Sequence, residues 1–201
     1  MTGGKFKNGA ATAAMYYVAQ WAVSRIKAGG SSAYGERGTP DGIDESYLRK
    51  NPRLKVTRTV IDGETHAMIE GNYDYENMTV DEAKQIELTI EEGFYKTFLG
   101  DGTRVHVYLD LRYDPNAPKP IVFRKAGVDV VSYMSADVGG KNININADKF
   151  TAALNDKYGV WHEFGHILGF QHANNGSYDL MSYDAENYFQ RRHFDMINKK
   201  Y

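Results

Sequence analysis

Three histidines and a glutamate lie within one short stretch of this chain, HEFGHILGFQH at positions 162–172. An α-helix turns once in about 3.6 residues, so His162 and His166 would lie one turn apart on one helix face. That separation lets two imidazoles share one metal ion. Glu163 would then lie beside both ligands without being one of them. The spacing requires a helix here and constrains the fold around it.

The third histidine cannot reach the same ion from an unbroken helix. His172 follows His166 by six positions, which corresponds to a rotation of roughly 240° about a helix axis. The chain must therefore turn before His172. Gly169 can end a helix in the left-handed conformation without strain from a Cβ atom. The pattern predicts a helix that ends at Gly169 and a turn that brings His172 back to the metal.

Three neutral imidazoles are typical of catalytic zinc, because such a site keeps one coordination position for water. Zinc lowers the pKa of that water toward about 7, and a neighbouring carboxylate can take its proton as hydroxide attacks a carbonyl carbon. Zinc would also polarise the carbonyl oxygen. The residues alone therefore predict a zinc hydrolase in which Glu163 is the general base and later passes its proton to the leaving amine.

The arrangement HExxHxxGxxH, followed by Met181, resembles the metzincin clan of zinc endopeptidases. The resemblance implies that the three histidines bind Zn2+, that Glu163 is the general base and that Met181 forms a Met-turn beneath the metal. Tyr183 extends the pattern to Met-x-Tyr. In the astacin and serralysin branches that tyrosine can approach the zinc, which implies a catalytic role for Tyr183.

The motif does not decide the branch of the clan, because the sequence HEFGH is also similar to that of matrixins. Astacins carry a glutamate after the third histidine and have disulfides, whereas Ala173 follows His172 here and the chain has no cysteine. The lack of cysteine also removes the propeptide switch of matrixins. The glycine-aspartate calcium repeats of serralysins do not occur.

The order of predicted elements indicates an α+β fold. Residue alternation and short apolar runs predict strands at 55–60, 65–75, 104–111, 121–123, 128–133 and 142–146. A capping box at Thr79–Glu82 predicts a helix that ends at Gly100. Its apolar face would consist of Ala83, Ile86, Ile90, Phe94 and Phe98, packed against the Val105, Val107, Leu109 and Leu111 face of a strand.

The metal-binding helix is expected to begin near Lys157 or Tyr158. Asp184 is expected to cap a final helix that carries Tyr188, Phe189, Phe194 and Ile197. This order is similar to the metzincin layout: a twisted, mostly parallel sheet with an antiparallel edge strand, a backing helix, a zinc helix, a Met-turn and a C-terminal helix. Metzincins align an extended peptide along an exposed edge strand, for which 128–133 is the candidate here.

Composition divides the chain into three regions. Residues 1–30 hold an uncharged apolar run, expected to form a helix, and 31–53 are rich in glycine and proline, as linkers are. The peptidase-like domain is assigned to 54–201. The apolar run is too short to span a bilayer and is not a credible signal peptide. A net charge of −2 argues against nucleic acid as a partner.

The segment Phe6–Ala14 reads FKNGAATAA. It resembles the segment that opens the variable tips of Rhs-type polymorphic toxins. The resemblance implies a C-terminal toxin tip, such as a type VI secretion effector, that is secreted or delivered into a target cell. The implied partners are a larger delivery protein, a cognate immunity protein and a protein or peptide substrate in the target cell.

Two alternatives to an endopeptidase remain at this point. One is a zinc amidase that acts on cell-wall peptides, and the other is a zinc-binding interaction module without catalysis. Intact Glu163 argues against the module. The other histidines of interest, His66, His106 and His193, lie in strand-like or helical contexts and are expected to be structural or solvated.

Overall fold

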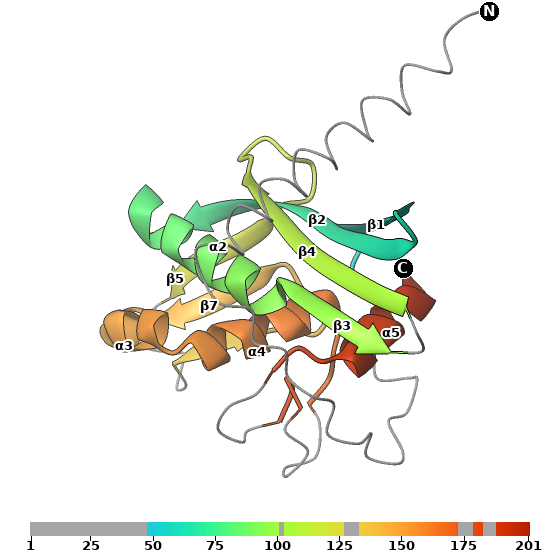
Figure 1. Ribbon diagram of the computed structural model, residues 1–201. Helices are drawn as coiled ribbons and strands as arrows, with labels where there is room; N and C mark the ends of the chain where they lie inside the picture. Colours follow the sequence, from blue (N-terminus) through green and yellow to red (C-terminus); the bar gives the residue numbers. More distant parts are fainter. Residues whose placement is uncertain (1–47, 101–102, 127–132, 173–178, 183–187) are drawn as a thin grey trace, which may run out of the picture. The chain divides into compact units, whose positions relative to one another are not determined.

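The computed structural model describes residues 48–100, 103–126, 133–172, 179–182 and 188–201 (Figure 1). The chain divides into two units, Met1–Gly35 and Glu36–Tyr201, and every described residue belongs to the second. The predicted N-terminal helix, the toxin-like segment and residues 31–47 of the predicted linker therefore lie outside the described residues.

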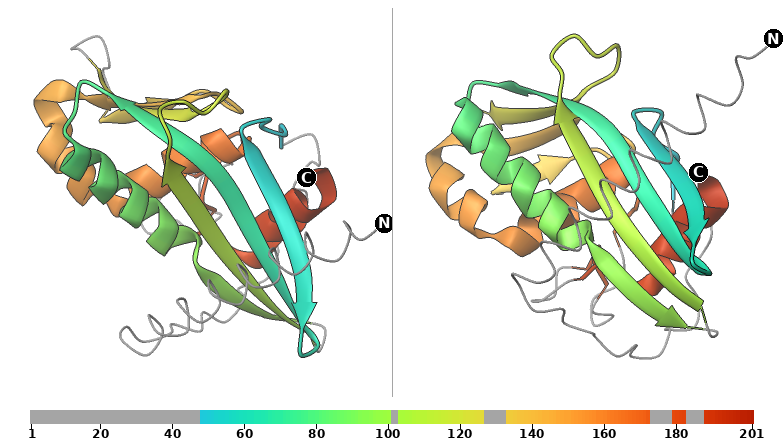
Figure 2. Two further views of the ribbon diagram at one scale, coloured as in Figure 1. Left: turned by 90° about the horizontal axis from the view of Figure 1, so that it is seen from above. Right: turned by 45° about the horizontal axis from the view of Figure 1, so that its top comes forward.

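The described fold is α+β, as predicted, and its centre is a curled sheet (Figure 2). The sheet has seven strands in the described residues: β1 Leu54–Ile61, β2 Glu64–Glu76, β3 Lys96–Gly100, β4 Thr103–Tyr113, β5 Ile121–Ala126, β6 Met134–Ala136 and β7 Asn142–Asn146. The central strands β4, β2, β5 and β7 are parallel neighbours in that order. The outer strands β1, β3 and β6 pair antiparallel with β2, β4 and β7.

Helices pack against one face of this sheet. The described helices are α2 Val80–Phe94, the 3-10 helix η2 Ala147–Lys149, α3 Phe150–Asn155, α4 Lys157–Leu168 and α5 Arg191–Lys200. Buried residues of these four α-helices share one hydrophobic core with the inward residues of the strands (Figures 1 and 2). None of the helices among the described residues combines the length and the hydropathy of a membrane-spanning helix.

Several predicted elements are confirmed. The strands predicted at 55–60, 65–75, 104–111, 121–123 and 142–146 each lie within an observed strand. Ala67, Ile69 and Tyr73 of β2 are buried in the core, as their alternation predicted. The capping box is also present, because Thr79 Oγ1 accepts from the Glu82 N–H at 3.2 Å and Glu82 Oε2 accepts from the Thr79 N–H at 2.7 Å.

The prediction that this helix continues to Gly100 is wrong. Helix α2 ends at Phe94, and Lys96–Gly100 forms the edge strand β3, paired antiparallel with β4. Phe94 and Phe98 both contribute to the core. A spacing of four residues returns to the same side in a helix and also in a strand, so the apolar pattern fits either element. Pairing with β4, which needs an edge partner, favours the strand.

The predicted start of the last helix is also wrong. Tyr188 and Phe189 precede α5, which begins at Arg191 after Gln190. The Gln190 N–H donates to Nδ1 of His193 at 2.9 Å, so a histidine one turn into the helix satisfies a group at its start. Asp184, the predicted cap, lies outside the described residues.

The antiparallel edge strand next to the metal-binding helix is β6, at Met134–Ala136. The candidate edge at 128–133 lies outside the described residues except for Tyr133. No prediction was made for β6, η2 or α3. These elements are short, and such lengths carry little periodicity from which to predict them.

Candidate metal centre

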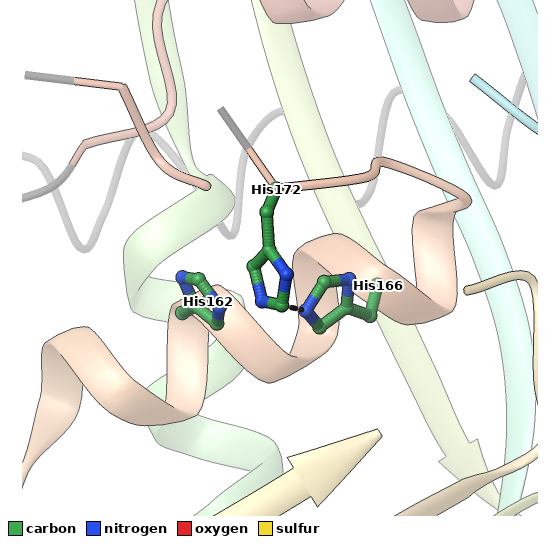
Figure 3. Close-up of side chains that lie close together, drawn as sticks. All are labelled: His162, His166 and His172. Atoms are coloured by element: carbon green, nitrogen blue, oxygen red, sulfur yellow. Dashed lines mark hydrogen bonds between the residues drawn. The ribbon is translucent and has the colours of Figure 1, made fainter. Parts of the chain in front are cut away.

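Helix α4 positions the first two histidines. Its N-terminus is capped by Asp156, whose Oδ1 accepts from the Gly159 N–H at 3.0 Å. The rings of His162 and His166 project from the same side of the helix, with centroids 4.9 Å apart (Figure 3). Both side chains are buried.

Gly169 ends α4 and turns the chain. Its φ of 104° is left-handed, and its N–H donates to the His166 carbonyl at 2.9 Å. A Cβ atom at this position would lie 1.7 Å from the carbonyl oxygen of Arg49, whose N–H donates to the Gly169 carbonyl at 2.8 Å. Glycine is therefore required both by the backbone conformation and by the segment that crosses the helix end.

The segment that crosses the helix end consists of residues 48–53, which belong to the range predicted as linker. Three contacts hold it in place. Leu48 forms an isolated β-bridge with Phe170. The buried Asn51 amide donates to the Gly140 carbonyl at 2.9 Å and to the Ile167 carbonyl at 2.7 Å. These bonds satisfy a carbonyl in the last turn of α4 that has no partner within the helix.

The turn brings His172 back beside the helix. One ring nitrogen from each of the three histidines lies within 4.8 Å of the others, and the Nε2 atoms of His166 and His172 are 3.0 Å apart. Figure 3 shows His172 entering from the segment after the helix and pointing at the two helical rings. The three histidines form a group that could hold a metal ion.

Backbone carbonyls orient the two helical rings. His162 Nδ1 lies 3.1 Å from the Leu180 carbonyl oxygen, and His166 Nδ1 lies 2.8 Å from that of Phe170. A carbonyl only accepts, so each Nδ1 carries the hydrogen and each neutral ring presents Nε2 to the metal. Outer partners of this kind commonly fix metal-binding histidines.

Electrostatics also favours the neutral, metal-binding form of these rings. Burial, together with the neighbouring His166 and His172, lowers the pKa of His162 to about 4. Burial likewise lowers the pKa of His166 and of His172. Since a metal binds the unprotonated ring, the site needs little proton release at neutral pH.

Glu163 lies next to the first ligand, on a half-buried part of α4. Burial raises the pKa of Glu163 to about 7, and a hydrogen bond with the backbone of Ala136 opposes that rise. Ala136 is the last residue of β6. A carboxyl whose pKa lies near neutrality can both take up and release a proton, and this one is attached to the edge of the sheet.

Met181 packs against the metal-binding helix at Gly165. Its side chain is fully buried, and a Cβ on Gly165 would lie 2.3 Å from its Sδ. Leu180, whose carbonyl orients His162, precedes it in the same turn. The glycine thus allows this turn to approach the helix that carries the histidines. Tyr183 lies outside the described residues.

Asp179 and His193 hold this turn, and neither was predicted to act on the site. Asp179 Oδ1 accepts from the Met181 N–H at 2.8 Å and lies 3.0 Å from Nε2 of His193, while Arg192 Nη2 lies 3.2 Å from Oδ2. Burial acts to raise the pKa of Asp179, but His193, the Met181 N–H and Arg192 outweigh it and lower that pKa to about 2. His193 is fully buried, in accord with its expected structural role.

The remaining two histidines of interest lie outside this centre. His66 and His106 are on β2 and β4, where they form a separate group with Glu64.

No family model matches the chain, and no curated protein matches it either. Functional assignment therefore depends on the geometry of the site. Three imidazole nitrogens, two of them on rings oriented by backbone carbonyls, fit zinc, which accepts nitrogen ligands at about 2.0–2.1 Å in tetrahedral arrangements.

Proposed function

We propose that this protein is a zinc-dependent endopeptidase of the metzincin type. The observation that carries the proposal is the convergence of His162, His166 and His172 on one point, with Glu163 beside them. Three protein ligands are the number typical of catalytic zinc, whereas structural zinc usually has four. Bound Zn2+ would supply Lewis acidity toward a carbonyl oxygen and would lower the pKa of water beside it.

Glu163 would perform the proton transfers. Its carboxylate takes a proton from water as the water oxygen bonds to the carbonyl carbon of the substrate. The same carboxyl then gives that proton to the amine nitrogen as the C–N bond breaks. Burial raises the pKa of Glu163 to about 7 in the metal-free chain. A nearby Zn2+ would act in the opposite direction and would favour the ionised carboxylate that the first step needs.

Strand β6 is the proposed binding edge for the peptide. It is the last strand of the sheet on its side, and no other described strand pairs with its outer edge. Ala136 of β6 hydrogen-bonds Glu163, so a peptide added along this edge would pass close to the general base. Addition of a strand gives affinity through backbone hydrogen bonds and is compatible with a protein substrate.

Removal of the metal is expected to abolish peptide hydrolysis. A chelator-treated chain should lose about 100-fold or more of its activity on an unfolded protein or a quenched fluorescent peptide pool, since Lewis acidity and water activation are lost together. Addition of one equivalent of Zn2+ should restore it. The measurement is the initial rate before chelation, after chelation and after zinc addition, with Mg2+ addition as the control.

The same preparation distinguishes the two alternatives. Hydrolysis of purified peptidoglycan at a rate equal to or above that of protein would favour the zinc amidase. Zinc binding without hydrolysis of either substrate would favour the interaction module. A chain that cleaves protein equally well with and without chelator would contradict the proposal.

We also propose that the enzyme acts as a toxin after delivery into another cell. The support is the sequence Phe6–Ala14, which lies outside the described residues. Production of the chain in a bacterial cytosol is expected to arrest growth, and production of the Glu163→Gln variant at the same level is expected not to. Normal growth of several bacterial hosts that make the active enzyme would argue against an antibacterial role and would leave the peptidase assignment intact.

A further inference from the structure

The sheet carries a second group of metal-binding side chains. Among the described residues, Glu64, His66 and His106 are the other group of three whose ligand atoms lie within 4.8 Å of one another. His66 of β2 is the register partner of His106 of β4, and Glu64 is two residues before His66 on the same side of β2. All three side chains are half-buried.

This group lies on the sheet face that points away from the hydrophobic core. Residues of β2 alternate, so Glu64 and His66 face the opposite way from the core residues Ala67 and Ile69. On β4, His106 lies between the core residues Val105 and Val107 and therefore faces away from the core. The group therefore belongs to a different surface from the histidine triad of α4.

Both rings have an outer hydroxyl partner at Nδ1. Nδ1 of His66 lies 3.0 Å from the Tyr108 hydroxyl, and Nδ1 of His106 lies 3.1 Å from Oγ1 of Thr97. A metal-binding imidazole usually donates its other N–H to such an acceptor, which fixes the tautomer and the ring orientation. Metal binding would place the ring hydrogen of each histidine on Nδ1 and would leave Nε2 to the ion.

The carboxylate completes the set of donors. Nε2 of His106 donates a hydrogen bond to Oε2 of Glu64 at 2.6 Å, and a bound ion would take the place of that hydrogen. The other oxygen, Oε1, lies 3.2 Å from Nη1 of Arg104, which holds the carboxylate and leaves Oε2 on the side of the rings. The two rings are stacked, with centroids 4.6 Å apart and planes 17° apart.

We propose that Glu64, His66 and His106 bind a second divalent metal ion of the zinc class. Two imidazoles and one carboxylate are ligands that Zn2+ accepts, and their ligand atoms lie within 4.8 Å of one another. Rotation of one ring out of the stack would direct both Nε2 atoms at a single ion. The ion would cross-link β2 to β4. An ion bound only by the folded chain stabilises that chain by mass action.

Zinc stoichiometry tests this site directly. The full chain is stripped of metal, equilibrated with micromolar free Zn2+ and analysed for bound metal. We expect two zinc ions per chain for the wild type and one for His66→Gln/His106→Gln, in which the amides preserve size and polarity. A double variant that binds as many zinc ions as the wild type would overturn the proposal.

A variant without the first site isolates the second. His166→Gln/His172→Gln is expected to bind one zinc, and zinc should raise its thermal unfolding temperature. Combining all four substitutions should remove both the bound zinc and the temperature shift. This readout is independent of peptidase activity, so failure of the second site and failure of the proposed enzyme are distinguishable.

Glu70 supplies the matched control for Glu64. It lies on the same side of β2 and pairs with Lys55 at 3.6 Å. Glu64→Gln should weaken the second zinc, whereas Glu70→Gln should leave it unchanged. Tyr108→Phe and Thr97→Val should each weaken it about tenfold through loss of the ring-orienting hydroxyl. Equal affinity in Glu64→Gln and Glu70→Gln would exclude Glu64 as a ligand.

Discussion

Glu163→Gln is expected to lower kcat for peptide hydrolysis by about 1,000-fold and to leave the zinc content unchanged, because general acid–base catalysis contributes about 10²–10⁴-fold. Glutamine keeps the size of the side chain, and its carbonyl oxygen can still accept the hydrogen bond with the Ala136 backbone. It cannot take a proton from water. The variant therefore separates proton transfer from folding and from metal binding.

The measurement is kcat and KM on a quenched fluorescent peptide, together with the metal content of the same sample. Glu92→Gln is the matched control, because Glu92 is an exposed carboxylate on helix α2. That control should retain wild-type kcat. If Glu163→Gln kept more than a tenth of the activity with its zinc intact, another group would have to be the base. A loss of zinc would instead show that Glu163 supports the ligands.

The metal triad was predictable because its determinants are local. His162 and His166 are positioned by one turn of helix, and Gly169 reverses the chain within the next turn. Helical geometry and the conformational freedom of glycine apply in any fold. The candidate site could therefore be described from eleven consecutive residues without knowledge of what surrounds them.

The groups that support the triad were not predictable, because they meet only after folding. Asp179 and His193 are separated by fourteen positions, and Asn51 reaches the end of α4 across a separation of 116 positions. Nothing near any of these residues in the sequence marks its partner. Burial of a polar side chain demands a hydrogen-bond partner, but which partner it finds depends on the tertiary fold.

The second metal group shows the same limit. Glu64 and His66 lie two residues apart on the same face of β2. His106 joins them only through the register of β2 against β4. Parallel pairing of two strands that are about forty residues apart is a long-range choice, and a shift of one residue would turn His106 to the core. The histidines were therefore expected to be structural or solvated, and the sequence carried no sign of their convergence.

Phe98 illustrates a different limit, since its local pattern was present but ambiguous. Four residues separate it from Phe94, and both contribute to the core. Residues four apart lie on nearly the same face of a helix and on the same face of a strand. The fold class was still predictable, because the order of the longer strands and helices does not depend on where α2 ends.

Gly169→Ala is expected to destabilise the folded chain by about 3 kcal/mol or more, at the upper end of single substitutions. A left-handed φ of 104° strains any residue with a Cβ, and the added atom would lie 1.7 Å from the Arg49 carbonyl oxygen. To relieve that contact the segment at 48–53 must move. Its movement would break the 2.8 Å bond from Arg49 to Gly169 and disturb the bonds of Asn51.

The same displacement should weaken zinc binding, because Gly169 sets the path of the chain to His172. A loss of about tenfold in affinity corresponds to only ~1.4 kcal/mol of misplacement at one ligand. The measurements are the free energy of unfolding by urea without metal and the zinc affinity of the folded variant. Measuring stability without metal keeps the backbone effect separate from the loss of a ligand.

Gly63→Ala isolates the conformational part of this cost. Gly63 lies between β1 and β2 with φ +82°, and nothing lies within 4 Å of a Cβ placed there. Gly63→Ala should therefore lower the free energy of unfolding by only about 1–2 kcal/mol, the cost of a strained left-handed residue. It should leave unchanged the zinc affinity of the centre formed by His162, His166 and His172, measured with the second group removed by His66→Gln/His106→Gln. The excess in Gly169→Ala measures the close approach of Arg49. Equal losses at the two glycines would mean that residues 48–53 yield freely and that the crossing segment does not position the metal ligands.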